Sequence, residues 1–200
     1  MSSSTPTPRL QHFVQQLSQT LEHSADEAAL LAGATPLLRA LVAHDDWLPD
    51  AFAQSHPRHY QQFLLHADPA GRFSVVSFVW GSGQGTPIHD HTVWGLIGML
   101  RGAEEGQRYA RDAQGRWLPD GPAQALRPGQ VEAVSPSIGD VHRVRNLLPD
   151  QVSISIHVYG ADIGKVQRHV FTEDGGVKPF VSGYANAAPC PPFSTLRNSP

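Results

Sequence analysis

From about residue 71 onward, the chain consists of short runs of β-branched and aromatic residues separated by Gly, Pro, Asn and Asp. The runs follow one another at intervals too short to hold helices between them, which is typical of an antiparallel β-protein. The expected strands are Phe73–Trp80, Thr92–Arg101, Gln107–Tyr109, Gln130–Val134, Val141–Asn146, Val152–Tyr159 and Gln167–Phe171. Many short antiparallel strands predict a sandwich, a jelly roll or a small barrel.

The N-terminal part has a helical pattern instead. Apolar residues at helical spacing between residues 10 and 21 predict an amphipathic helix. The sequence Ser24–Glu27 has the form of a capping box, with Ser24 as the N-cap, and predicts the start of a second helix. Thr35 and Pro36 have the form of an N-cap and first-turn pair, which predicts a third, short helix ending near residue 44.

We expect a single domain, because 200 residues with 40% hydrophobic content suffice for one sizeable core. Its expected parts are a helical part over about 9–70, a β-barrel over about 71–172 and an extended C-terminal arm over about 173–200. The net charge of -3 and the lack of a basic cluster predict no nucleic-acid partner. Without a signal-peptide pattern or an apolar run of about 18 residues, we expect a cytoplasmic protein without a membrane partner.

The sequence TPIHDHTVWG, residues 86–95, carries two histidines one residue apart. Because alternate side chains of a strand share a face, His89 and His91 can bind one metal ion. A pair of this kind can equally be a polar surface feature. About fifty residues later, a third histidine, His142, follows a turn in the sequence PSIGDVHRVRN, which favours a metal site. Cys190, the single cysteine, lies in a Pro-rich tail and is interpreted as incidental.

These two stretches resemble the two motifs of the cupin superfamily. The matching residues are Gly83, His89, His91 and Gly102 in the first motif, and Pro136, Gly139, His142 and Asn146 in the second. The resemblance implies a cupin fold, mainly β, a small barrel or jelly roll with about three helices packed on it. It also implies that the three histidines bind a metal ion. The glutamate of the first motif is replaced by Gly95. Three neutral imidazoles do not neutralise any of the positive charge of the metal ion, which favours an anionic ligand such as a thiolate. These ligands suit iron or zinc.

The sequence VSISIHVYG, residues 152–160, alternates between apolar and polar side chains. On a strand, the valines and isoleucines share one face, and Ser155, His157 and Tyr159 share the other. The polar face is either the wet side of a strand or a hydrogen-bonded row that points into the barrel. In the second case, the Tyr159 hydroxyl reaches the ligands bound to the metal.

A Ser-x-His-x-Tyr sequence after a three-histidine cupin site resembles the thiol dioxygenases, the family of cysteine dioxygenase. The chain is similar to that family from Tyr60 through the histidine pair. In mammalian-type members, an arginine two residues after this tyrosine binds the substrate carboxylate, whereas Gln62 stands here. Those enzymes also carry a cysteine, crosslinked to the tyrosine that matches Tyr159, in the region of Gly95. Both departures resemble the bacterial branch that contains 3-mercaptopropionate dioxygenase.

This resemblance implies an Fe(II) enzyme that converts 3-mercaptopropionate and dioxygen to the sulfinic acid 3-sulfinopropionate. It implies substrate binding by Arg168, Gln62 and Tyr60, since an arginine fork suits a carboxylate, although Arg168 can also be read as a solvated strand end. Tyr159, oriented by the serine and histidine of its strand, would donate a hydrogen bond. The alternatives are a dioxygenase acting on L-cysteine, cysteamine or mercaptosuccinate, a zinc-dependent hydrolase or isomerase, and a non-catalytic metal-binding cupin.

Overall fold

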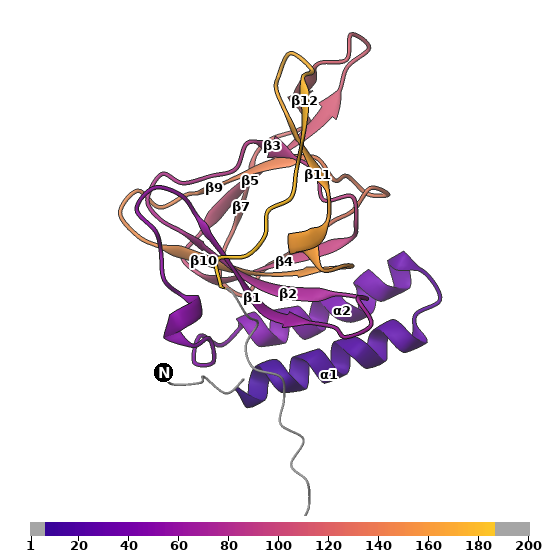
Figure 1. The fold of residues 1–200 in the computed structure, drawn as a ribbon, viewed down its shortest axis with the longest axis vertical. Coiled ribbons are helices and arrows are strands. Elements are labelled where there is room, and N and C mark those ends of the chain that lie inside the picture. The colour runs from indigo at the N-terminus through magenta and orange to yellow at the C-terminus, as the bar shows by residue number, and fades with distance from the viewer. Residues whose placement is uncertain (1–6, 187–200) are drawn as a thin grey trace, which may run out of the picture.

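The computed structural model describes residues 7–186, in which two curled antiparallel sheets face each other and two α-helices cover the outer side of one sheet (Figure 1). This confirms the predicted mainly β fold with N-terminal helices. The terminal residues 1–6 and 187–200, which include Cys190 and most of the Pro-rich tail, lie outside the described residues.

The first helix, α1 (Pro8–His23), has the predicted amphipathic pattern. It begins with proline in its first turn, where a missing N–H is harmless. Leu10, Phe13, Val14 and Leu17 are buried against the rest of the core, as the helical spacing of the apolar residues requires. Neither α-helix in residues 7–186 is long and apolar enough to cross a membrane.

The capping box predicted at Ser24 is wrong. Ser24 instead closes α1, because its hydroxyl and its N–H both donate to the Thr20 carbonyl, at 2.6 and 3.0 Å. The N-cap of α2 (Glu27–Val42) is Asp26, whose side chain accepts from the Ala29 N–H at 2.8 Å. Glu27 is therefore free of a capping role, and its carboxylate binds two serine hydroxyls of the β8–β9 loop.

The separate third helix predicted at Pro36 is also wrong, because α2 continues through the proline. Its buried residues keep helical spacing from Leu30 to Val42. Packing of this face therefore holds the helix together where Pro36 cannot donate a backbone hydrogen bond. The Thr35 hydroxyl donates to the Leu31 carbonyl at 2.6 Å instead of capping a new helix. A short 3₁₀ turn, η1 (Asp50–Phe52), follows.

Two sheets form the barrel. The strand order in the first is β1 (Gln61–Ala67), β2 (Ser74–Trp80), β10 (Ser153–Tyr159), β4 (Gly95–Arg101) and β8 (Val131–Val134). The order in the second is β12 (Val177–Phe180), β11 (Arg168–Phe171), β3 (Ile88–His89), β9 (His142–Asn146), β5 (Glu104–Arg111) and β6 (Trp117–Pro119), and β7 (Gln124–Leu126) also pairs with β5. The 3₁₀ turn η2 (Ile163–Lys165) precedes β11. Successive strands from β2 to β5 and from β8 to β11 alternate between the sheets, so the chain winds around a common interior.

Several strands were not predicted. The run FLL in β1 was assigned to the helical part, because a short continuous apolar run has no period that separates a strand from a helix. β6, β7 and β12 are short and largely exposed, and β12 lies where an extended arm was expected. β3 ends at His89, so His91 lies in the loop after the strand and not on it.

β10 separates two cores. Its apolar residues Ile154, Ile156 and Val158 pack with both α-helices, as the alternation predicts. Its polar residues point the other way, into the barrel, where Tyr159 packs with Phe78 and other side chains of a second core. One strand therefore joins the helix-covered side of the molecule to its interior.

Gly98 on β4 allows α2 to approach the first sheet. A Cβ there would lie 2.8 Å from Leu38 Cγ and 3.0 Å from Val42 Cγ1. Gly98→Ala is expected to lower the free energy of unfolding by about 1–3 kcal/mol, since the helix must shift. Gly106→Ala on β5 is the matched control, because its Cβ would meet nothing closer than 3.6 Å. Urea unfolding of both variants checks this, and equal midpoints would contradict the close packing of α2.

Candidate active site

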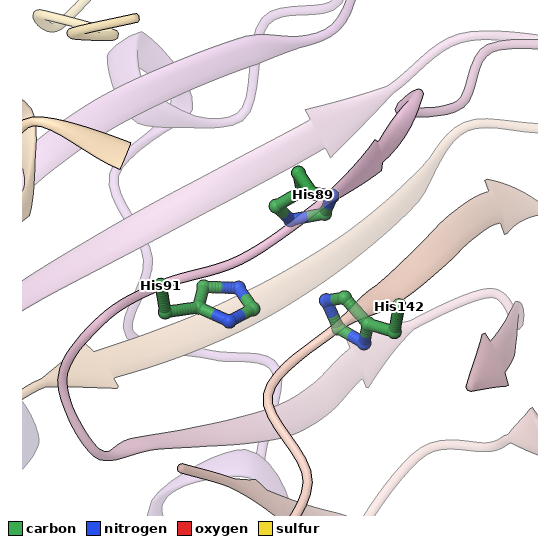
Figure 2. Close-up of side chains that lie close together, drawn as sticks. All are labelled: His89, His91 and His142. Atoms are coloured by element: carbon green, nitrogen blue, oxygen red, sulfur yellow. The ribbon is translucent and has the colours of Figure 1, made fainter. Parts of the chain in front are cut away.

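Three histidines from two strands and a loop meet inside the barrel (Figure 2). His89 on β3 is the register partner of His142 on β9, and His91 follows two residues after His89. Their candidate ligand nitrogens all lie within 4.8 Å of one another, and each side chain is at most 7% exposed. These residues, called the histidine cluster below, occupy the positions that the sequence motifs predicted for metal ligands.

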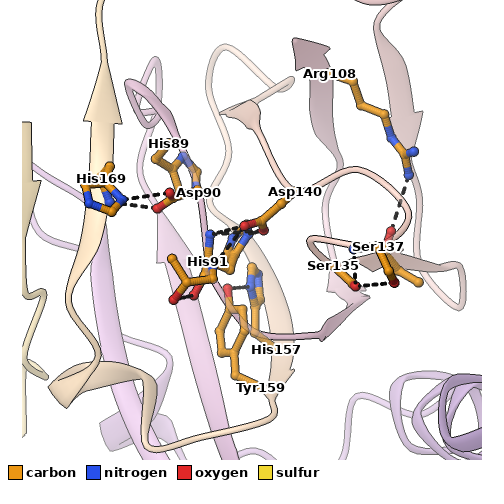
Figure 3. A network of polar contacts seen from close by, with 12 residues as sticks. His89, Asp90, His91, Arg108, Ser135, Ser137, Asp140, His157, Tyr159 and His169 are labelled. Atoms are coloured by element: carbon orange, nitrogen blue, oxygen red, sulfur yellow. Dashed lines mark hydrogen bonds and ion pairs between the residues drawn. The ribbon is translucent and has the colours of Figure 1, made fainter. Parts of the chain in front are cut away.

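Hydrogen bonds fix the ring orientation of two members of the cluster. His89 Nδ1 lies 3.1 Å from the Pro87 carbonyl oxygen. His91 Nδ1 lies 2.8 Å from Asp140 Oδ1 (Figure 3). Because both partners only accept, each Nδ1 carries the hydrogen and each Nε2 keeps a lone pair. A histidine that binds a metal through one nitrogen and donates from the other has this arrangement.

Burial keeps two members of the cluster, His89 and His142, neutral. Desolvation, helped by the neighbouring His91, lowers the pKa of His89 to about 3, and burial likewise lowers the pKa of His142 well below its usual value. A neutral imidazole offers a lone pair to a metal ion, whereas a protonated one repels it. The site is therefore ready to bind a cation at neutral pH.

Asp140 was not singled out in the sequence, yet it organises the loop that carries His91. Its carboxylate accepts from the His91 ring, from the His91 N–H and from the Thr92 N–H at 2.9 Å. Thr92 has a φ of 61°, a left-handed conformation that β-branched residues rarely adopt, and its hydroxyl donates to the His91 carbonyl. A signal was available, since Asp140 stands two residues before His142 in the second motif.

Asp90, between the two histidines of the first motif, points away from the cluster. Its carboxylate accepts from the His169 N–H at 2.7 Å and pairs with the His169 ring at 2.8 Å. This contact ties β11 to the loop after β3 (Figure 3).

Gly95, where the cupin motif has glutamate, lies opposite Tyr159 in the β4–β10 register. A Cβ at this position would lie 2.9 Å from Tyr159 Cδ1. The tyrosine ring therefore fills the space that a side chain at residue 95 would need. Among the described residues, the cluster has no carboxylate member.

The polar side chains of β10 form a continuous row of hydrogen bonds. Ser155 Oγ lies 2.8 Å from His157 Nε2, and His157 Nδ1 lies 2.7 Å from the Tyr159 hydroxyl. All three are at most 3% exposed, so the face is not the wet side of a strand. Trp80 Nε1 donates to Ser155 Oγ at 3.3 Å, and Phe78 stacks on His157 at 4.1 Å. We call Ser155, His157 and Tyr159 the Ser-His-Tyr row.

Arg168 is buried, at 3% exposure, and not a solvated strand end. One terminal nitrogen donates to Ser182 Oγ at 2.6 Å, whereas Nε has no hydrogen-bond partner among the described residues. Gln62 Nε2 donates to the same Ser182 hydroxyl at 3.0 Å and to the Gly183 carbonyl at 2.8 Å. Ser182, which the sequence did not indicate, thus links the two side chains predicted to bind substrate.

A single cavity of about 290 Å³ connects these groups. Its lining includes the histidine cluster, His157 and Tyr159 of the Ser-His-Tyr row, and the three residues predicted to bind substrate: Tyr60, Gln62 and Arg168. Tyr60 stacks against Trp80 and Phe78, with ring centroids 4.6 and 5.9 Å apart. The cavity accordingly has a metal-binding end and a cationic end, which suits a small ligand with a different group at each end.

A family model described as cysteine dioxygenase type I matches residues 2–171. The chain belongs to the cysteine dioxygenase type I family. It is 30% identical over 110 residues to the human protein named cysteine dioxygenase type 1, a match that covers 54% of either chain. The zebrafish protein of that name is 29% identical over 118 residues, covering 57% of this chain and 56% of its own length. The chain therefore spans about half the length of the curated relatives it matches.

The likeness to solved structures is weaker. An uncharacterized conserved protein with a double-stranded β-helix domain from Klebsiella pneumoniae aligns with a TM-score of 0.45 and 18% identity, over 56% of this chain and 80% of that chain. A cupin superfamily protein from Desulfitobacterium hafniense aligns with a TM-score of 0.44 and 13% identity, over 60% and 94%.

The cysteine dioxygenase type I family consists of non-haem metalloenzymes, and the histidine cluster fits a metal ion of that kind. Buried neutral imidazoles suit iron, zinc, copper and nickel. The donor set thus agrees with the family without selecting one metal.

Asp140→Asn tests how the loop supports the cluster. An amide cannot accept from the His91 ring and both backbone N–H groups as a carboxylate does, so we expect about 10- to 100-fold weaker metal binding. Competition titration with a chelating dye measures the affinity. Asp112→Asn, in the distant β5–β6 turn where Asp112 accepts the Arg116 N–H, is the matched control. Equal affinity of the Asp140 variant and the unmodified protein would rule out the supporting role.

Proposed function

We propose that this protein is an Fe(II)-dependent thiol dioxygenase that converts 3-mercaptopropionate and dioxygen to 3-sulfinopropionate. The observation that carries the proposal is the placement of a histidine cluster, the Tyr159 hydroxyl and the Arg168 guanidinium around one cavity. A thiol acid has one end for a metal and one end for a cation. Membership of the cysteine dioxygenase type I family supports the oxidation of a thiol.

His89, His91 and His142 would hold the iron, His89 and His91 through the Nε2 atoms that their Nδ1 hydrogen bonds leave free. Iron held there would supply open coordination positions for a thiol and dioxygen, and it would lower the pKa of a bound thiol. Because imidazole ligands carry no charge, the protein would leave the positive charge of the ion uncompensated.

At the other end of the cavity, Arg168 would bind the substrate carboxylate. Its Nε has no partner among the described residues and is buried, and a carboxylate would satisfy this donor. Gln62 lines the same cavity, and its amide nitrogen donates to the Ser182 hydroxyl and to the Gly183 carbonyl. The Ser182 hydroxyl accepts from both side chains, which fixes Gln62 and Arg168 relative to each other.

Tyr159 would donate a hydrogen bond to the reacting sulfur or oxygen atoms. Burial raises the pKa of Tyr159 far above its usual value, so the phenol keeps its proton. His157 holds the hydroxyl in place at 2.7 Å, and Ser155 holds His157 from behind. A phenol that stays protonated and fixed in a dry cavity is a preorganised donor.

The overall reaction is R–SH + O2 → R–SO2H, which balances without a further reactant. The sulfur loses the electrons that dioxygen gains, and both oxygen atoms end on the sulfur. The thiol proton leaves when the thiolate forms, and the sulfinic acid is ionised at neutral pH. No external reductant is required.

The first test is oxygen consumption by the iron-loaded protein with 3-mercaptopropionate and, separately, with L-cysteine, with the sulfinate identified. We expect a higher kcat/KM for 3-mercaptopropionate, because no carboxylate of the pocket lining receives the amino group of cysteine. L-cysteine is the second candidate, since the curated relatives are named for it. A preference for cysteine would contradict the substrate assignment, and no oxygen uptake with either thiol would contradict the activity.

Arg168→Met tests the carboxylate contact. Loss of a charged hydrogen-bond donor is expected to raise the KM for 3-mercaptopropionate about 10- to 100-fold. The KM for cysteamine, a thiol without a carboxylate, should stay unchanged in the same variant. Arg145→Met, which removes an exposed arginine paired with Glu105, is the control. If both thiols lose affinity equally, Arg168 acts on the structure of the pocket and not on the carboxylate.

A further inference from the structure

A buried carboxyl group at the start of β5 has no part in the proposed reaction. Glu104 is 1% exposed and lies beside the polar face of β10, at the serine end of the Ser-His-Tyr row. The Ser153 hydroxyl lies 3.4 Å from Glu104 Oε1. The other oxygen, Oε2, has no hydrogen-bond partner among the described residues, and the Ser155 hydroxyl is close enough to lower the pKa of the carboxyl.

Glu104 holds its proton at neutral pH. Burial raises its pKa to about 8, and the hydroxyls of Ser155 and Ser153 offset only part of this rise. A protonated carboxyl group can donate a hydrogen bond, whereas an ionised one can only accept. The group is therefore a donor at neutral pH and becomes an acceptor in mildly alkaline solution.

The surroundings of Glu104 contain little other charge. Its register partners are Asn146 on β9 and Leu126 on β7, neither of which titrates. The adjacent Glu105 is paired with Arg145 at 2.7 Å, and their side chains are 26% and 60% exposed. The titratable groups of β10 are His157 and Tyr159 themselves, both members of the row.

The Ser155 hydroxyl has two ways to use all its hydrogen-bonding capacity. Trp80 donates to it in either case, which leaves one lone pair and one hydrogen. One of these meets His157, and the other is free for the carboxyl group of Glu104. If Glu104 donates, Ser155 donates to His157 Nε2. If Glu104 accepts, Ser155 donates to it and accepts from His157 Nε2.

We propose that Glu104 is a positioning residue that shares a hydrogen bond with the Ser155 hydroxyl, and that its proton sets the direction of the hydrogen bonds along the Ser-His-Tyr row. With the carboxyl protonated, His157 carries its hydrogen on Nδ1 and donates it to the Tyr159 oxygen, so the phenol hydrogen points into the cavity. With the carboxyl ionised, His157 carries its hydrogen on Nε2, and Tyr159 donates to Nδ1. The cavity then faces a phenol lone pair and loses its donor.

The tautomer of His157 tests this directly. We would record ¹⁵N spectra of the histidine-labelled full chain loaded with Zn²⁺, which is diamagnetic and accepts histidine ligands, from about pH 6 to about pH 10. The His157 signals are assigned by their loss in His157→Gln. We expect the Nδ1–H form at low pH and the Nε2–H form at high pH.

Two variants separate Glu104 from other groups. Glu104→Gln has a neutral side chain that donates at every pH, so His157 should keep the Nδ1–H form throughout. Glu105→Gln, which changes the adjacent carboxylate that pairs with Arg145, should behave like the unmodified protein. One tautomer at all pH values in the unmodified protein, or the same exchange in Glu104→Gln, would overturn the proposal. If Glu104→Gln fails to fold, Ser155→Ala takes its place, because this variant removes the hydroxyl that connects Glu104 to His157.

A kinetic consequence rests on the proposed function. The kcat for 3-mercaptopropionate should fall above about pH 8 in the unmodified protein, while KM stays constant because Glu104 does not contact Arg168 or Gln62. In Glu104→Gln, this alkaline loss of kcat should be absent, and an unchanged alkaline limb would count against Glu104. If no thiol consumes oxygen, the proposed function fails, and the tautomer measurement still decides the role of Glu104.

Discussion

Apolar and polar side chains alternate along β10, and this alternation determines how the helices, the barrel and the active site are arranged. A strand has two faces, and here one face is committed to the helices by Ile154, Ile156 and Val158. The other face must then point into the barrel, which brings the Ser-His-Tyr row to the histidine cluster. Pairing with β4 places Tyr159 opposite Gly95, where its ring has room. A register slip of one residue would bury the apolar residues in the cavity and turn the polar row toward the helices.

The features that follow from local pattern could be predicted from the sequence. The alternation in β10 and the two histidine motifs predicted which side chains would meet, and the cavity joins them. Features that depend on distant contacts could not be predicted. α2 continues through Pro36 because its buried face holds it, and β1 forms because β2 pairs with it, which no window of sequence around either segment reveals. Ser182 lies more than a hundred residues from Gln62 in sequence, so only the fold shows their contact.

Burial determines the chemistry of the polar groups inside the barrel. It keeps His89 and His142 neutral and Tyr159 protonated, so the cavity has lone pairs for a cation at one place and a hydrogen-bond donor beside it. Asp140 is the exception, because hydrogen bonds from His91 and Thr92 outweigh its burial and lower its pKa. The ionised carboxylate of Asp140 contacts the histidine cluster only through His91. It therefore orients the His91 ring without itself being a metal ligand.

In the proposed reaction, the histidine cluster holds the iron that transfers dioxygen to the sulfur of a thiol acid bound by Arg168. A single turnover of the iron-loaded protein with 3-mercaptopropionate under isotopically labelled dioxygen, with mass analysis of the product, tests this reaction. We expect a sulfinate in which both oxygens on sulfur carry the label. A product with oxygen from water, or a disulfide without added oxygen, would contradict the proposed reaction.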